Sequence, residues 1–232
     1  MLGISQPTFL PWIGFFAFLN QLDKFIFLDN VQFDKRSWQQ RNYIKLNNQK
    51  TLLTLPVETK GKFKQNISDV KILNLLELEK IKKKIFYAYK KSKYFDYYYS
   101  QICKIFDKCN LSLLKLNTDL INYFATELKI ETKIDYSSNY KFQSKKEELI
   151  FDLCKLNGCS NYISTIGAKK YLRDLNTIPN TNINIKYFVY ETAHYFQMQG
   201  TFIPQLSIID LLFNNGDESK IIFKKGFQLK NE

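Results

Sequence analysis

The sequence has little of the residue types on which many catalytic and metal centres depend. It contains one histidine, His194, and three arginines, Arg36, Arg41 and Arg173. A single imidazole excludes a histidine-rich metal centre. The scarcity of arginine argues against base-specific contacts with nucleic acid, which often use that side chain. Only 8 glycines and 5 prolines occur in 232 residues, which leaves little room for long flexible linkers.

The cysteines do not form a recognisable metal or disulfide pattern. Cys103 and Cys109 are spaced C-x5-C, and Cys154 and Cys159 are spaced C-x4-C, unlike the paired C-x2-C of a zinc site. We therefore expect free cysteines that are buried or without a chemical role, and no metal site formed by them. No stretch of ~18 apolar residues is present, so a membrane span is not expected. Without a basic, cleavable leader at the N-terminus, the sequence predicts a cytoplasmic protein.

Lysine and aromatic residues are abundant. The formal net charge is +12, and the 20 phenylalanines and 15 tyrosines predict an aromatic-rich core. Residues 60–93 carry eleven lysines against three acidic residues. Two interpretations stay open for this stretch. It is either the solvated face of a helix or a positive field that attracts phosphates or an anionic membrane surface.

The N-terminal pattern predicts a strand, a helix and a second strand within about thirty residues. Residues 1–5 are apolar, residues 12–22 have helical spacing, and residues 24–30 form a second apolar run, KFIFLDN. Such a βαβ unit joins two parallel strands by a right-handed crossover. Ligands of these sheets bind beyond the carboxyl ends of the strands. Both QPTFLPW and DNVQFDKR follow predicted strand ends, so we expect both at that edge.

The remaining patterns alternate between strands and helices. A hairpin is predicted over 43–57 with its turn at Asn47–Asn48, followed by helices over 75–109, with a break near 93–94, and over 112–128. Further predicted elements are a strand at 133–136, a helix at 146–158 ended by Gly158, strands at 159–165 and 184–191, a glycine turn and short helix at 166–172, and a helix from Ser207 to Gly216. The sequence thus predicts one α/β domain over 1–232 with a mostly parallel sheet and a helical insertion at about 75–129.

The stretch QPTFLPWIGFF (6–16) is either an ordinary loop before the first helix or the rim of a ligand site. Pro11 fixes the chain before the helix, whose first N–H groups could face an anion. The candidate binding residues here are Gln6, Pro11, Trp12 and Gly14. The layout is similar to the HxGH loop of nucleotidyltransferases, with Trp12 and Phe15 at the places of the two histidines. A nucleotidyltransferase-like topology without that chemistry is compatible with this pattern.

A second cluster of polar residues occupies positions 29–45. Its candidate binding residues are Gln32, Lys35, Arg36, Trp38, Arg41, Asn42 and Lys45. Arginine and lysine near a strand end suit a diphosphate, and an indole can stack on a base or a sugar. The alternative is a surface turn held by ion pairs. Asp29, at the strand end, is a candidate proton acceptor.

The third cluster lies between Tyr190 and Asp210. It includes His194, the single imidazole, and Gln197, a candidate binding residue. His194 is either a general base or a structural hydrogen-bonding group. Asp210 sits in the apolar run LSIIDLL, where an unpaired carboxylate is costly to bury. It either caps its own helix near Ser207 or pairs with a base such as Arg41, and it is a third candidate for proton transfer.

The order of these motifs resembles the WbqC-like family along essentially the whole chain. The similarity is carried by QPTFLPWIGFF, LDKFIFLDNVQFDKRSWQQRNYIK and LTLPV, and later by KEELIFDLCKLNGCSNYIS, IGAKKYL and YFQMQGTFIPQLSIIDLLFNNG. Where the family has His-Pro before a Tyr-x-Gln element, this chain has Thr192-Ala193, with His194 next. A role of the family histidine therefore does not transfer directly to His194.

The resemblance implies a role in the synthesis of O-antigen or other bacterial surface polysaccharides. The expected activity is N-acyl or aminoacyl transfer, for example of glycine, to a nucleotide-linked deoxyamino sugar, with an activated acyl or aminoacyl donor as co-substrate. Nucleic acid is not expected as a partner unless transfer RNA is that donor. The alternative is a non-catalytic protein of the same pathway that contacts the anionic inner membrane peripherally.

Overall fold

The computed structural model describes residues 1–144, 147–166, 183–198 and 200–231. Its centre is a six-stranded sheet with the strand order β5-β2-β1-β6-β7-β8. These strands are β1 (Leu2–Ser5), β2 (Lys24–Phe27), β5 (Lys133–Tyr136), β6 (Asn161–Thr165), β7 (Asn184–Tyr190) and β8 (Phe227–Asn231). All neighbouring pairs are parallel except β7 and β8. The prediction of an α/β fold with a mostly parallel sheet is confirmed.

The N-terminal βαβ unit is also confirmed. β1 pairs in parallel with β2, from Leu2 opposite Lys24 to Ser5 opposite Phe27. Helix α1 (Ile13–Leu19) joins them and is shorter than the predicted 12–22, because the chain turns at Asn20 toward β2. Every residue of α1 is buried, which explains its uniformly apolar sequence.

The sheet is covered on both faces. Phe25 and Phe27 point into the same core as α1, and Phe18 of α1 lies 6.2 Å from the ring of Phe25. Ile26, between them on β2, points to the other face, where it packs with residues of α5 (Glu147–Leu156) such as Leu153. The alternation of side chains along a strand thus divides the apolar residues between two layers of helices.

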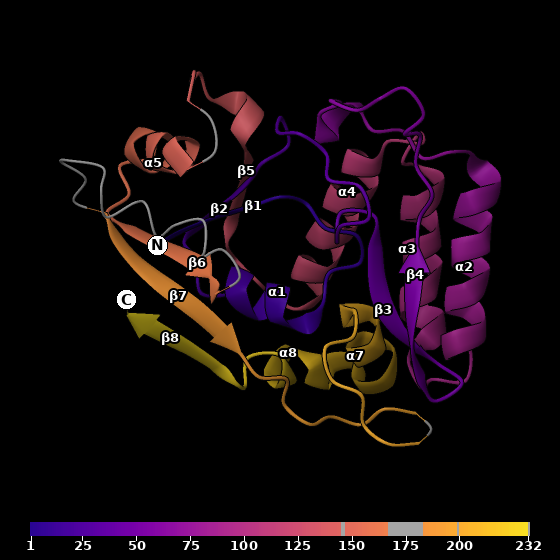
Figure 1. Cartoon of the computed structure of the whole chain (residues 1–232). Helices are drawn as coiled ribbons and strands as arrows, with labels where there is room; N and C mark the ends of the chain where they lie inside the picture. The colour runs from indigo at the N-terminus through magenta and orange to yellow at the C-terminus, as the bar shows by residue number, and fades with distance from the viewer. Residues whose placement is uncertain (145–146, 167–182, 199, 232) are drawn as a thin grey trace.

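A separate hairpin and three helices lie at the other end of the molecule from β8 (Figure 1). The hairpin strands are β3 (Arg41–Leu46) and β4 (Gln49–Thr54). The predicted turn residues Asn47 and Asn48 have φ of 52° and 60°, as a two-residue hairpin turn requires. The helices are α2 (Leu75–Tyr89), α3 (Phe95–Asp107) and α4 (Leu113–Glu127), so the predicted break falls at residues 90–94.

The C-terminal part contains helices α7 (Ile208–Asn215) and α8 (Ser219–Ile222). Short 3-10 turns occur at η1 (Ile67–Asp69), η2 (Ser137–Asn139) and η5 (Gly216–Glu218). Ser207 precedes α7 as predicted, but its side chain makes no capping hydrogen bond. Its backbone N–H instead donates to Tyr43 O, which ties α7 to the hairpin. The predicted glycine turn and helix at 166–172 lie outside the described residues except for Ile166.

Strand β8 and helix α8 were not predicted from the sequence. β8 is an antiparallel edge strand whose residues alternate weakly between polar and apolar. Among the described residues, none of the helices has both the length and the apolarity that a membrane crossing requires.

Candidate functional site

A large hollow in the described structure opens at the carboxyl ends of the parallel strands. It has a volume of about 660 Å³ and borders Ser5 at the end of β1, Thr165 at the end of β6 and Tyr190 at the end of β7. The chain runs outward from β1 to β2 and β5 and then returns to β6 on the other side of β1. The direction of winding therefore reverses between β1 and β6, which is where open parallel sheets bind ligands.

Aromatic side chains are the most frequent type in the lining of the cavity. They are seven of the sixteen described lining residues: Trp12, Phe15, Phe18, Trp38, Tyr43, Phe188 and Tyr190. The others are Ser5, Thr8, Gly14, Asn42, Lys50, Thr165, Ile166, Val189 and Gln205. All three sequence clusters contribute, so the first stretch, QPTFLPWIGFF, is the rim of a cavity as well as the entry to a helix. Among these residues there is no carboxylate and no imidazole.

Hydrogen bonds hold the first two clusters together. The backbone N–H of Phe9 donates to Trp38 O over 2.8 Å. The buried amide of Asn42 donates to Phe9 O and Leu10 O, over 3.2 and 2.9 Å. Leu10 is fully buried at a φ of 42°, an unusual backbone conformation for a leucine. Asn42 therefore stabilises a loop that is unfavourable by itself.

The third cluster is joined to the first two by backbone hydrogen bonds. Ile13 N–H donates to Leu206 O, and Ile208 N–H donates to Pro11 O. Pro11 is buried here, between the strand end and α1. Since Ser207 also bonds to Tyr43, the segment before α7 contacts both other clusters through its backbone. These contacts join parts of the chain that are about 160 to 195 residues apart.

Two tryptophans belong to the lining. The ring of Trp12 lies edge-on to Tyr190, with 5.6 Å between the ring centroids. Trp38 is 49% exposed and lies 5.8 Å from Tyr43. One indole is thus partly buried against α1, and the other is about half exposed to solvent. Such rings offer flat apolar surfaces for a base or a sugar.

Positive charge is present at the Trp38 side of the cavity. The Lys50 ammonium lies 4.7 Å from the centroid of the Tyr43 ring, and the Arg41 guanidinium lies 5.8 Å from that of Trp38. The buried Nε of Arg41 and the hydroxyl of Tyr190 have no hydrogen-bond partner among the described residues. Burial raises the pKa of Tyr190 to about 12, so its phenol is protonated near neutral pH.

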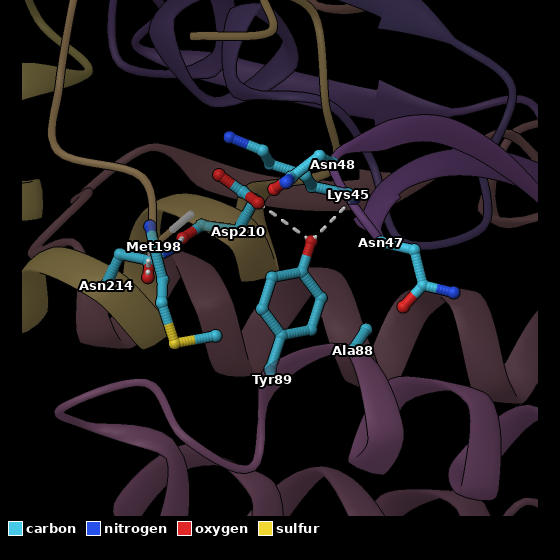
Figure 2. Close-up of a pocket in the computed structure, with 8 residues that line it drawn as sticks. All are labelled: Lys45, Asn47, Asn48, Ala88, Tyr89, Met198, Asp210 and Asn214. Carbon is cyan, nitrogen blue, oxygen red and sulfur yellow. Dashed lines mark hydrogen bonds between the residues drawn. The ribbon is translucent and has the colours of Figure 1, made fainter. Parts of the chain in front are cut away.

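A second polar cluster, between the hairpin, α2 and α7, surrounds the buried Asp210 (Figure 2). Asp210 Oδ2 accepts a hydrogen bond from Tyr89 over 2.8 Å, and Oδ1 accepts one from Tyr195 over 2.9 Å. The Tyr89 hydroxyl also accepts from the backbone N–H of Lys45, and the Tyr195 hydroxyl accepts from Gln197 Nε2. Neither predicted arrangement of Asp210 occurs: its side chain bonds to two tyrosines rather than to its own helix end or to Arg41.

The Asp210 cluster connects the hairpin to the segment before α7. The Lys45 ammonium donates to Gln197 Oε1 and Thr201 O, over 3.3 and 2.8 Å. Gln197 also accepts from Ile203 N–H over 2.9 Å. The space beside Asp210 has a volume of about 10 Å³, which is room for one water molecule at most.

Burial dominates the electrostatics of this cluster. It raises the pKa of Asp210 to about 6, against the lowering effect of the Tyr89 and Tyr195 hydrogen bonds and of the Lys45 charge. Burial also lowers the pKa of Lys45, opposed by the charge of Asp210. Both tyrosine pKa values lie well above their ordinary value, mainly because of burial. With this pKa, Asp210 is mostly ionised near pH 7. Its carboxylate then accepts hydrogen bonds from both tyrosine hydroxyls, which keep their protons.

The other two proton-transfer candidates do not line the cavity. Asp29 is buried, and its carboxylate accepts hydrogen bonds from Ser137 Oγ, Ser138 N–H and Ser138 Oγ, over 2.9, 3.0 and 2.7 Å. It therefore fixes the turn after β5. His194 is exposed, and its ring centroid lies 4.0 Å from that of Phe202.

The remaining binding candidates lie in two other places. Gln6 accepts a hydrogen bond from Gln39 Nε2 beside the first loop. Gln32 and Lys35 donate to Phe63 O and Thr59 O, over 3.2 and 3.4 Å, so they contact the loop after β4. Arg36 is exposed, and its φ of 60° marks a reversal of the chain.

Several lining residues were not singled out from the sequence. Thr165 and Tyr190, like Ser5, are the last residues of parallel strands. They line the cavity because the carboxyl ends of these strands meet at one edge of the sheet. Lys50 and Tyr43 required knowledge of how the hairpin packs. Tyr89 occupies the apolar stripe of α2 and gave no signal for a polar role.

Metal ligands do not gather in the described part of the chain, where groups of three or more His, Cys, Asp or Glu side chains are absent. The four cysteines are free thiols, with Cys109 and Cys154 buried.

Comparison with known proteins agrees with this arrangement of motifs. Residues 6–222 match the WbqC-like protein family. The chain is 31% identical over 221 residues to the uncharacterized protein Rv1507c of Mycobacterium tuberculosis (strain ATCC 25618 / H37Rv), with 94% of each chain covered. No solved structure matches the chain. The family match spans all three clusters that meet at the cavity, and the chain belongs to the WbqC-like protein family.

Proposed function

We propose that the protein binds a nucleotide-linked deoxyamino sugar in the aromatic cavity and transfers an acyl or aminoacyl group to its amine. This activity would serve bacterial surface-polysaccharide synthesis, in agreement with the resemblance of the motifs. The observation that carries the proposal is the meeting of Trp12, Trp38, Tyr43 and Tyr190 at the carboxyl edge of the sheet. Flat rings at such an edge suit a ligand with a base and a sugar.

The size and charge of the site support the same ligand class. A volume of about 660 Å³ lies within the range of ordinary small-molecule sites. We assign the diphosphate to the Lys50 and Arg41 side of the cavity, because these cations lie beside the Tyr43 and Trp38 rings. Lys35, Arg36 and Arg41 were the sequence candidates for this role, and none of the three is among the described lining residues. Arg41 keeps the role because its guanidinium lies beside the Trp38 ring, whereas Lys35 contacts the loop after β4 and Arg36 is exposed. Lys50, which lines the cavity, takes the place of Lys35 and Arg36 in the proposal.

The proposed transfer joins an amine to an activated carbonyl carbon. The amine lone pair attacks a thioester or ester, a C–N bond forms, and the C–S or C–O bond breaks. The leaving group takes the electron pair of that bond, and the proton lost by the amine neutralises it. The protonated Tyr190 is the candidate donor of a hydrogen bond to the substrate, since burial keeps its pKa near 12. The donor is an activated acyl or aminoacyl compound.

The two tryptophans allow a direct binding test. The chain contains only Trp12 and Trp38, and both line the cavity. Titration with a panel of nucleotide-linked amino sugars should quench the intrinsic fluorescence, and Trp38→Ala should weaken binding about tenfold or more. Phe196→Ala is the matched control, because Phe196 is 68% exposed and lies outside the lining. An unchanged affinity in Trp38→Ala would contradict the assignment of the cavity.

A second candidate function is binding without turnover. It is favoured by the lack of a carboxylate or imidazole among the described lining residues. Incubation with nucleotide-linked amino sugars and acyl-CoA, aminoacyl-tRNA or aminoacyl thioesters separates the two functions. A product heavier by the acyl or aminoacyl mass supports the transferase. Quenching without such a product from any donor supports the binding protein.

A further inference from the structure

Helix α2 has one face that packs and one that does not. Leu78, Ile81, Ile85 and Tyr89 recur every three or four residues and are buried against the core. Figure 1 shows α2 at the outer edge of the molecule, at the end opposite β8. With 3.6 residues per turn, positions 76, 80, 83, 87 and 90 fall on the side that faces away from the core.

The outer face of α2 carries exposed apolar side chains. Leu76 and Tyr87 lie on this face and are 61% and 66% exposed, and Leu75, at the start of the helix, is 67% exposed. Single exposed apolar residues are ordinary, but three such side chains on one helix form a patch. Within it the Tyr87 ring lies edge-on to Phe86, with 5.6 Å between the centroids. The helix is about 22 Å long, so the patch extends along one side of the molecule.

Four lysines surround these apolar residues. Lys83, Lys84, Lys90 and Lys91 are exposed, and none of them has a carboxylate within 4.0 Å in the described part of the chain. Their neighbours differ, because Lys80 pairs with Glu77, and Lys82 with Glu79 and Asp107. The four ammonium groups are therefore available to an external anionic surface.

We propose that the outer face of α2 docks on an anionic lipid bilayer surface. A basic helix face with interspersed apolar and aromatic residues binds favourably at the headgroup region of an anionic bilayer, because its cations attract the lipid phosphates and its apolar side chains leave water. Leu75 and Leu76 would enter the acyl boundary, while the lysine stems extend toward the phosphates. A nucleic acid would use the lysines but leaves the leucines without a partner, and arginine, its usual contact, does not occur on α2. This inference is independent of the cavity.

Co-sedimentation with vesicles tests the proposal. The full chain should bind vesicles of phosphatidylglycerol and phosphatidylcholine at low salt, and should bind pure phosphatidylcholine weakly. The variant Lys83→Gln/Lys84→Gln/Lys90→Gln/Lys91→Gln should lose affinity roughly 100-fold or more. Leu76→Ser/Tyr87→Ser should weaken binding without a change of charge, which separates lipid insertion from simple electrostatic attraction.

A matched control removes the same charge elsewhere. Lys129, Lys133, Lys224 and Lys225 are exposed and lie outside α2, so their fourfold glutamine variant should keep most of the vesicle affinity. Three results would overturn the proposal: no binding of the native chain to anionic vesicles, equal losses in both lysine variants, or tighter binding of a single-stranded oligonucleotide that displaces the vesicles.

Discussion

The indole ring of Trp12 lies across Gly14, where an added Cβ would come within 2.3 Å of two of its ring carbons. A methyl group at position 14 therefore cannot coexist with the present position of the ring. Because the same ring contacts Tyr190 and lines the cavity, Gly14 determines the shape of the site through Trp12.

Gly14→Ala should displace the Trp12 ring and lower ligand affinity about tenfold. The overpacking costs roughly 1–3 kcal/mol, while alanine in place of glycine in a helix returns about 1 kcal/mol. The loss of stability should therefore be small beside the loss of binding. Fluorescence of Trp12 in a Trp38→Phe background measures the displacement directly.

A double-mutant cycle identifies the cause. In a Trp12→Ala background the added methyl group meets no ring, so Gly14→Ala should have little further effect on affinity. Equal effects of Gly14→Ala in both backgrounds would mean that the substitution acts on α1 rather than on the indole.

Asp29→Asn should destabilise the protein without a specific loss of ligand binding. Both carboxylate oxygens accept hydrogen bonds from Ser137 or Ser138, and the amide group of asparagine faces one of these donors. We expect a decrease of about 2–3 kcal/mol in the free energy of unfolding, measured by urea denaturation. Asp34→Asn, at an exposed site, is the control. Normal stability together with lost turnover would instead make Asp29 a substrate-contacting residue.

His194→Ala should leave ligand affinity unchanged and alter stability by about 0.5 kcal/mol. The imidazole is exposed, stacks on Phe202 and does not line the cavity. Tryptophan quenching and thermal denaturation check both expectations. A large fall in transfer rate with normal binding would restore the general-base role.

The N-terminal half of the site could be predicted from sequence because it rests on local patterns. The apolar runs that form β1 and β2 also place QPTFLPW at the carboxyl edge of the sheet, where Trp12 and Gly14 line the cavity. Asn42 and Trp38 were named from their polar and aromatic character, and both line it as well.

The rest of the site depends on the directions in which side chains point and on contacts between residues far apart in the sequence. Local sequence patterns encode neither. Arg36 has a left-handed backbone, and its side chain is exposed, which spacing along the chain does not reveal. Tyr89 and Asp210 are 121 residues apart, and only the packing of α2 against α7 and the hairpin brings them together. The sequence identified Asp210 as costly to bury, but it could not supply the partner.

Asp210 gives the most specific prediction about pH. Its pKa is about 6 in the folded chain, against an ordinary value of 3.8. Between these values the folded state binds more protons than the unfolded state, so the stability that Asp210 contributes falls as the pH rises. The change amounts to roughly 2–3 kcal/mol between pH 4 and pH 8.

Asp210→Asn cannot titrate and should remove this dependence. The wild-type chain should exceed the variant in unfolding free energy by more at pH 4.5 than at pH 7.5, because protonation stabilises the buried carboxyl group. Tyr89→Phe removes a hydrogen bond that lowers the Asp210 pKa, so it should move the midpoint of the transition to higher pH. Urea denaturation of the three proteins across this pH range measures both effects. A wild-type advantage that does not vary with pH would mean that Asp210 titrates normally and that water reaches it in the folded state.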